Sequence, residues 1–252
     1  MRARSVVLLK DSLWAECATR LNFAEVHVYD RYDRVGGLLI YGIPGFKLEK
    51  ELVERRAKHL RDSGIHFHLA SDIGGAGPSF AELRRRHEAV FIGTGVYKAR
   101  DLSAPGCGLP GIVPALQFLT SSNRKGLGDA VPAFDDGTLD AAGKHVVVIG
   151  GGDTAMDCVR TAVRQGARSV RCLYRRDRSN MPGSQREVAN AEEEGVEFVW
   201  LAAPKGFTGN GAVEGVVVER MRLGAPDVTG RQSPNSLYSM KHEIFYYLYD
   251  LD

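Results

Sequence analysis

The chain has 252 residues, 44% of them hydrophobic, and a net charge of +2 at pH 7. This length fits one large or two small globular domains, and the nearly balanced charge favours neither nucleic acid nor an anionic membrane surface as a partner. No segment approaches the roughly 18 consecutive apolar residues of a transmembrane helix, and the N-terminal apolar run is too short for a signal peptide, so a cytoplasmic protein is expected.

The four cysteines, Cys17, Cys107, Cys158 and Cys172, are scattered and form no C-x-x-C motif. This spacing gives no disulfide framework, no zinc site and no thiol–disulfide redox centre. Reduced thiols, as in a reducing cytoplasm, are the default for such a pattern.

The N-terminal segment has the two strands of a dinucleotide-binding βαβ unit but not its glycine loop. Short apolar runs at 5–9 and 25–30 predict the strands. Between them, Lys10–Ala15 stands where Gly-x-Gly-x-x-Gly is expected, and no glycine occurs before Gly36. Large side chains in this stretch would occupy the space in which the backbone must approach a pyrophosphate. The first unit is therefore predicted to be incomplete.

The chain then alternates helical and strand patterns. The predicted elements are an amphipathic helix, a strand, a short basic helix and a strand ending in Gly-Thr-Gly, over 47–63, 65–69, 80–87 and 89–95. His66 and His68 share one face of the first of these strands. Two such histidines can hold a metal, but they are more typical of a solvated strand face, so no metal site is predicted. A Pro/Gly linker (98–111), a helix (113–123) and a polar loop (124–143) follow.

Three successive glycines form the most informative motif. They follow a β-branched run, His145–Ile149, and precede a helical pattern. Read as G-x-G-x-x-A, the motif consists of Gly150, Gly152 and Ala155. Gly150 is expected to permit the tight turn, Gly152 to admit a pyrophosphate and Ala155 to let the helix pack on the strand. Free N–H groups at the helix N-terminus would bind the phosphates, whereas a purely structural turn is the alternative.

Two arginines after the next strand specify the nucleotide. The predicted strand Ser169–Tyr174 ends in Arg175 and Arg176. Arg175 lies twenty positions after Ala155, where an NAD-binding protein places an acid for the ribose 2′-hydroxyl. An acid there would repel a 2′-phosphate, whereas paired guanidiniums bind one. The pattern therefore predicts NADP(H).

Beyond the paired arginines, the pattern predicts a turn, a helix and two further strands. Ser184-Gln-Arg-Glu187 has the spacing of a capping box that opens the helix, which places Arg186 in the first turn. Arg186 is a third candidate for the 2′-phosphate or adenine side, and a solvated surface arginine is the alternative. Val196–Trp200 is predicted as the third strand of the unit and Val213–Leu223 as an antiparallel strand.

Several of these motifs resemble one family. The runs that carry the NADP-type pattern resemble the NADPH domain of the glutamate synthase small (β) chain: Gly150–Asp157, Leu173–Arg178 and Asn180–Val188. Val35–Glu49 resembles that family's flavin domain, and the similarity extends from about residue 26 to about residue 232. The resemblance implies an α/β fold of two Rossmann-like βαβ dinucleotide-binding domains, of which the first, flavin-type domain is incomplete. We therefore expect a partial FAD-binding-type domain, an NADP(H)-binding domain and an unmatched tail over 1–112, 113–232 and 233–252.

Candidate site residues follow from the motifs and from the resemblance. Those for NADPH are Gly150, Gly151, Gly152, Asp153, Thr154, Ala155, Arg175, Arg176 and Arg186. By resemblance, those for FAD are Asp30, Gly36, Gly37, Leu38, Pro44, Thr94 and Gly95. No catalytic residue is nominated, because in this family the protein positions the nicotinamide against the flavin and the cofactors carry the chemistry.

The resemblance implies the electron-input subunit of NADPH-dependent glutamate synthase. Hydride would pass from NADPH to FAD, and electrons would continue through iron–sulfur centres to the large (α) chain, where glutamate is formed. Three departures from the family's pattern oppose flavin and cluster binding here: the glycine-free loop, the missing Gly-Asp return segment and the missing cluster cysteines. The alternative is a non-catalytic NADP(H)-binding chain that purifies colourless. A thioredoxin-reductase-like enzyme is a third hypothesis, which the missing C-x-x-C motif opposes.

The last residues match none of the family's pattern and are rich in aromatic side chains. Four of the final eight residues are aromatic. Since a missing return strand leaves one edge of a parallel sheet unpaired, this tail could cover the edge, pair with another chain or lack structure.

Overall fold

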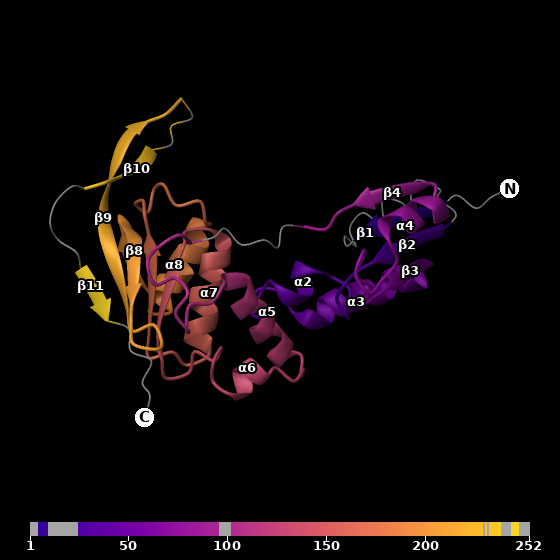
Figure 1. Cartoon of the computed structure of the whole chain (residues 1–252), viewed down its shortest axis with the longest axis horizontal. Helices are drawn as coiled ribbons and strands as arrows, with labels where there is room; N and C mark the ends of the chain where they lie inside the picture. The colour runs from indigo at the N-terminus through magenta and orange to yellow at the C-terminus, as the bar shows by residue number, and fades with distance from the viewer. Residues whose placement is uncertain are drawn as a thin grey trace. The chain divides into compact units, whose positions relative to one another are not determined.

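The computed structural model describes residues 5–9, 25–95, 102–228, 230, 232–237 and 243–246, with only the backbone described for 5–9 and 243–246 (Figure 1). The chain divides into two compact units. The first comprises Met1–Lys98 with Gly126–Gly128, and the second comprises Ala99–Lys125 with Asp129–Asp252. In the described residues, no helix has both the length and the apolar character needed to cross a membrane.

The first unit is a four-stranded parallel sheet with helices between its strands. Its elements are β1 (Ser5–Leu9), β2 (Glu25–Tyr29), α2 (Leu38–Tyr41), α3 (Lys50–Asp62), β3 (Ile65–His68), α4 (Phe80–Arg86) and β4 (Ala89–Ile92). The strand order is β3-β2-β1-β4, and every pair is parallel. This is the order expected of a dinucleotide-binding βαβ unit. The glycine-free stretch Lys10–Ala15 lies outside the described residues.

The two faces of this sheet are covered differently. Val26 and Val28 of β2 are buried with Leu60 of α3 and Ile65 of β3, so α3 covers one face. Tyr29 points to the other face, where it packs with Leu83 of α4. Side chains along β2 therefore point alternately to the two faces of the sheet, and each face has a buried cluster.

One helix start in this unit differs from the sequence prediction, and another has a cap that was not predicted. The helix predicted from Lys47 begins at Lys50, because the N–H groups of Lys47 and Leu48 both donate to the carbonyl of Pro44 in a preceding turn. Helix α4 opens with a capping box that the sequence analysis did not identify. The Ser79 side chain accepts from the Glu82 N–H, and the Glu82 carboxylate accepts from the Ser79 N–H.

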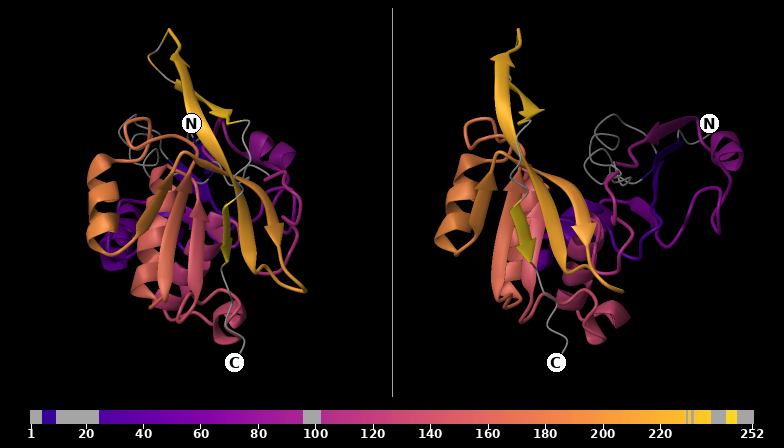
Figure 2. Two further views of the ribbon diagram at one scale, coloured as in Figure 1. Left: turned by 90° about the vertical axis from the view of Figure 1, so that its left-hand side faces the viewer. Right: turned by 60° about the vertical axis from the view of Figure 1, so that its left-hand side comes forward.

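The second unit has a parallel sheet between helices and antiparallel strands (Figure 2). Its elements are α5 (Ala115–Gly126), α6 (Pro132–Asp135), β5 (His145–Ile149), α7 (Asp153–Arg164), β6 (Ser169–Tyr174), α8 (Gln185–Glu193), β7 (Glu197–Trp200), β8 (Ala202–Thr208), β9 (Gly215–Pro226), β10 (Gln232–Ser236) and β11 (Glu243–Tyr246). The parallel sheet has the order β5-β6-β7. The predicted α/β class with two parallel βαβ sheets is confirmed.

Strand β6 packs against helices on one face and against the antiparallel strands on the other. Val170 and Cys172 are buried against residues of α7 and α8, such as Val159 and Val188. Leu173, which points to the opposite face, packs against side chains of β8 and β9. Burial of each such apolar side chain contributes roughly 1.5–3 kcal/mol. The glycine turn between β5 and α7 is thereby placed at one end of a sheet with a core on each side.

Strand β9 is the centre of the antiparallel layer. It pairs with β8 along one side, and with β11 and β10 along successive parts of the other side. The antiparallel strand predicted for 213–223 is confirmed, although it extends to Pro226. Three alternatives were open for the C-terminal tail: covering the edge of the parallel sheet, pairing with another chain or lacking structure. Its described strands, β10 and β11, pair with β9 of the same chain and not with the parallel sheet. The prediction of a loop at 124–143 was wrong in one respect, because this segment contains the short helix α6.

Candidate nucleotide-binding site

The turn between β5 and α7 requires glycine at its first position. Gly150 has φ +156°, and a Cβ built on it would lie 3.2 Å from the Cβ of Ala155. An L-residue is strained in this backbone conformation, and the close approach leaves room only for a small side chain on the helix. Gly150 and Ala155 therefore adopt the turn and the helix contact that the motif predicts.

The middle glycine has a role that the sequence analysis missed. A Cβ on Gly151 would overlap the ring carbons Cδ2 and Cε2 of Tyr174, at the end of β6. The Tyr174 hydroxyl donates to the Asn180 carbonyl at 3.0 Å, which fixes the ring beneath the turn. The contact with Tyr174 alone thus requires glycine at position 151.

The third glycine borders open space. Gly152 is the N-cap of α7, its φ is −93°, and no atom lies within 4 Å of a Cβ built on it. In the described part of the chain, the backbone N–H groups of Gly151, Gly152, Asp153 and Thr154 donate to no protein acceptor. Unpaired amides and the positive end of the helix dipole together form an anion-binding site. The residues present therefore fit a pyrophosphate.

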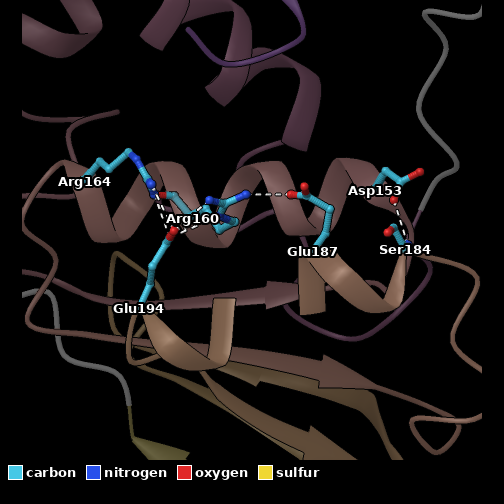
Figure 3. Close-up of polar contacts among 6 residues, drawn as sticks. All are labelled: Asp153, Arg160, Arg164, Ser184, Glu187 and Glu194. Carbon is cyan, nitrogen blue, oxygen red and sulfur yellow. Dashed lines mark hydrogen bonds and ion pairs between the residues drawn. The ribbon is translucent and has the colours of Figure 1, made fainter. Parts of the chain in front are cut away.

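The segment before α8 lies against this turn. The Gly183 N–H donates to the Gly151 carbonyl at 2.9 Å, and the Ser184 N–H donates to Asp153 Oδ1 at 3.0 Å (Figure 3). The capping box predicted at Ser184 was wrong. The Ser184 side chain makes no cap hydrogen bond, and the carboxylate of Glu187 binds Arg160 of α7 instead. The backbone, not the serine hydroxyl, joins the start of α8 to the glycine turn.

The two adjacent arginines lie in different environments. Arg175 is exposed, and no described residue forms a hydrogen bond or an ion pair with its guanidinium. Arg176 is only 6% exposed; its Nε donates to the Gln232 carbonyl at 2.8 Å, and its Nη1 approaches the Tyr174 hydroxyl at 3.4 Å. One guanidinium is therefore exposed to solvent, whereas the other is buried and bonded within the protein.

A further arginine lies exposed near the same end of the sheet. Arg186 is in the first turn of α8, two residues after Ser184, and within the described residues its guanidinium has no partner. Arg178, in contrast, pairs with Glu192 of α8 at 2.7 Å. Arg175 and Arg186 are thus the two candidate arginines whose charges are available to a ligand.

An ion-pair network joins α7 to α8. Arg160 donates to Glu187 Oε2 at 2.7 Å and to both oxygens of Glu194, and Arg164 also donates to both oxygens of Glu194 (Figure 3). The hydrogen bonds from Arg164 and then Arg160 lower the pKa of Glu194 from 4.5 to about 2. The hydrogen bond that Arg160 donates to Glu194 raises the pKa of Arg160. The apolar periodicity of α7 gave no sign of this buried guanidinium.

In the first unit, the flavin candidates lie in two groups. Asp30 follows β2, and Thr94 and Gly95 follow β4, so all three lie at the carboxyl end of the parallel sheet, where open α/β sheets bind ligands. Asp30 is buried, and its Oδ1 accepts from the Tyr32 N–H at 3.0 Å. Gly95 has φ +70°.

The second group surrounds α2. Gly36 and Gly37 have φ values of +123° and +53°, which favour glycine at both positions. A Cβ on Gly36 would lie 2.8 Å from Val53 Cγ1, so helix packing also excludes a side chain there. Leu38 is exposed and Pro44 is buried. A structural role therefore accounts for the first of these glycines without a ligand.

The histidines of β3 belong to a larger group than the sequence indicates. His68 Nε2 lies 2.9 Å from His27 Nδ1, and the His68 ring stacks on Tyr29, so the expectation of a solvated side chain was wrong for His68. His66 is exposed and stacks on His27. Burial, and then the charges of neighbouring histidines, lower the pKa of His68. No set of three or more His, Cys, Asp or Glu residues in the described ranges has the arrangement of a metal site.

Comparison with known proteins adds an independent result. A model of the pyridine nucleotide-disulphide oxidoreductase family matches residues 81–225, which is more than half of the chain. The chain is 68% identical over 210 residues to the glutamate synthase (NADPH) small chain of Azospirillum brasilense, covering 83% of this chain and 43% of that protein. It is 65% identical over 222 residues to the putative glutamate synthase (NADPH) small chain of Cereibacter sphaeroides, covering 88% of this chain and 53% of that protein. The chain thus spans about half the length of these relatives.

A solved structure supports the fold. FprA from Mycobacterium tuberculosis in complex with NADPH aligns with a TM-score of 0.77 over 97% of this chain and 69% of that chain. The sequence identity is 20%, so the likeness concerns the arrangement of the elements.

Proposed function

Because the chain belongs to the pyridine nucleotide-disulphide oxidoreductase family, we propose that it binds NADPH in its second unit, as the electron-input part of a glutamate synthase. One observation carries this proposal. The unpaired amides of the glycine turn lie at the same end of the sheet as Arg175 and Arg186, two exposed guanidiniums without a partner among the described residues. Neutral donors for a pyrophosphate and cations for a further phosphate are the combination that NADPH requires.

Each part of the site would meet a different part of the nucleotide. The N–H groups of Gly152, Asp153 and Thr154 would bind the pyrophosphate, and the open space beside Gly152 allows its close approach. Arg175, from the end of β6, would bind the 2′-phosphate, with Arg186 from α8 beside it. Arg176 would act mainly from within the protein, because two of its nitrogens already bond to the chain.

The first unit is assigned to the flavin. FAD would supply the acceptor for the hydride that NADPH delivers. Asp30, Gly36, Gly37, Leu38, Pro44, Thr94 and Gly95 are the residues assigned to its groove. The protein's own contribution is to hold the two nucleotides and to exclude competing reactions, so no side chain is assigned as a catalytic acid or base.

The relatives named as small chains of glutamate synthase support a large-chain partner. We therefore assign the large (α) chain as the destination of the electrons. The proposal concerns the whole assembly, since the present chain spans about half the length of those relatives.

Titration calorimetry with NADPH and NADH tests the nucleotide assignment. A single charge-assisted hydrogen bond contributes roughly 1.5–3 kcal/mol, so NADPH should bind at least about tenfold more tightly than NADH. Equal dissociation constants for the two nucleotides would contradict the assignment of the arginines.

A visible spectrum separates the enzyme from the non-catalytic alternative. The alternative is favoured by one observation, the glycine-free stretch Lys10–Ala15. Purified chain would be examined without and with excess FAD, and NADPH oxidation would be followed with ferricyanide. A yellow protein that reduces the dye supports the enzyme. A colourless chain that binds NADPH but stays inactive with excess FAD supports a nucleotide-binding chain without redox activity.

A further inference from the structure

One residue of α7 binds both ends of α8. Arg160 Nη1 donates to Glu187 Oε2 at 2.7 Å, near the start of α8, and Arg160 Nη2 donates to Glu194 Oε1 at 2.7 Å, at its C-cap (Figure 3). Its Nε also contacts both oxygens of Glu194, each at 3.1 Å. Arg160 is only 8% exposed, so these bonds are well shielded from water. A single guanidinium therefore binds carboxylates from both ends of α8.

These contacts lie next to a candidate ligand residue. Arg186 immediately precedes Glu187, and Ser184, two residues before it, donates its N–H to Asp153 at the start of α7. Arg186 thus lies between Ser184, the N-cap of α8, and Glu187, and both of these residues are bonded to α7. Its own side chain is exposed and binds no described residue.

The apolar contacts of α8 alone leave its orientation weakly determined. The helix has nine residues, and its buried side chains are those of Val188 and Ala191. So short a helix is marginal by itself, and two modest apolar contacts resist sliding or rotation poorly. Directional, charge-assisted bonds from Arg160 constrain both ends of the helix, in addition to the backbone bonds that hold its N-terminus.

We propose that Arg160 is a positioning residue for nucleotide selectivity: by binding Glu187 and Glu194 it fixes α8 so that Arg186 meets the 2′-phosphate. This inference rests on the proposed function, because it needs NADPH in the second unit. Arg160 itself does not touch the ligand. Its effect should therefore appear in the preference for NADPH and not in the binding of NADH.

Two substitutions that remove charges of opposite sign test this proposal. Glu187→Gln removes a negative charge next to the site, and Arg160→Gln removes a positive one. A purely electrostatic influence on a phosphate would make NADPH bind more tightly in Glu187→Gln and less tightly in Arg160→Gln. Positioning instead predicts that both substitutions raise the NADPH dissociation constant by about fivefold to tenfold, because either change removes the bond between Glu187 and α7. Dissociation constants for NADH should change by less than about twofold.

A matched control and a double variant complete the experiment. Glu193→Gln removes a negative charge from an exposed position on the same helix, where no described residue forms an ion pair with it, and should leave the selectivity unchanged. In an Arg186→Ala background, Glu187→Gln should have no further effect on NADPH binding, since Glu187 acts through Arg186. Circular dichroism and the melting temperature establish that each variant is folded.

Each outcome can be assigned. If Arg160→Gln does not fold, Arg160→Lys serves in its place, because one ammonium group keeps the charge but cannot reach both carboxylates. Tighter NADPH binding in Glu187→Gln, or equal losses with and without Arg186, would overturn the positioning role. Failure of the proposed function would look different, because the unmodified chain would then show no preference for NADPH at all.

Discussion

The ring of Tyr174 lies directly beneath Gly151, so that a Cβ on this glycine would lie 2.8 Å from the ring carbon Cζ and closer still to Cδ2 and Cε2. Tyr174 cannot easily yield, because it is buried and its hydroxyl donates to the Asn180 carbonyl. Gly151→Ala should therefore lower the free energy of unfolding by about 1–3 kcal/mol, as overpacking does. Chemical denaturation measures this. Tyr174→Leu combined with Gly151→Ala should recover part of the loss, and an unchanged stability in Gly151→Ala would contradict the contact.

The neighbouring glycine should respond in the opposite way. Gly152→Val places its side chain in open space at a backbone conformation that ordinary residues adopt, so the fold should be retained. The same side chain would occupy the space needed by the pyrophosphate, and binding of both NADPH and NADH should disappear. Titration calorimetry, with circular dichroism as the control for folding, measures both effects. Retained binding in a folded Gly152→Val variant would make this turn purely structural.

Substitutions of the two adjacent arginines should have different effects on NADPH binding and on stability. Arg175→Ala should weaken NADPH binding by at least about tenfold, leave NADH binding nearly unchanged and leave the melting temperature unchanged, because its side chain is exposed. Arg176→Ala should lower stability by about 1–3 kcal/mol, since it leaves the Gln232 carbonyl without its donor. Replacing both should abolish the preference for NADPH. An Arg176→Ala variant of normal stability that loses only NADPH binding would assign Arg176 to the ligand instead.

The ion-pair network predicts a pH dependence. The pKa of Glu194 is lowered from 4.5 to about 2, first by its hydrogen bond from Arg164, so its contribution to stability is complete above pH 4.5 and is lost as the pH falls toward 2. Glu194→Gln should remove roughly 1–2 kcal/mol at pH 7, an amount reduced by partial solvent exposure. The difference between the two proteins should shrink below pH 4.5. Denaturant titrations at several pH values measure it, with Glu193→Gln as the control; a constant difference would contradict the assignment.

The strands and helices around the glycine turn could be predicted closely from the sequence. The bounds of β5 and β6 agree with the prediction, and Gly166, with φ +84°, follows the end of α7. Short-range patterns determine these elements: a β-branched run, a period of 3.6 and a glycine stop. Helix α6 escaped this reasoning because a polar loop and a one-turn helix with a proline at its start have similar compositions.

The details of the site depend on contacts that the sequence pattern does not contain. The Tyr174 ring beneath Gly151 joins residues of different elements, and so do the bonds from Arg160 to Glu187 and Glu194. The different environments of Arg175 and Arg176 depend on such contacts as well. Arg176 bonds to Gln232 and Tyr174, whereas Arg175 has no partner among the described residues.

The contrast between Arg160 and the exposed Arg175 and Arg186 has a consequence for the response to ionic strength. At physiological salt the Debye length is about 8 Å, so dissolved ions weaken the attraction between exposed charges far more than between shielded ones. Added salt should therefore reduce the affinity for the extra phosphate of NADPH while α8 keeps its place. The ionic composition of the surrounding solution would then adjust the choice between the two nicotinamide nucleotides without any change in the shape of the protein.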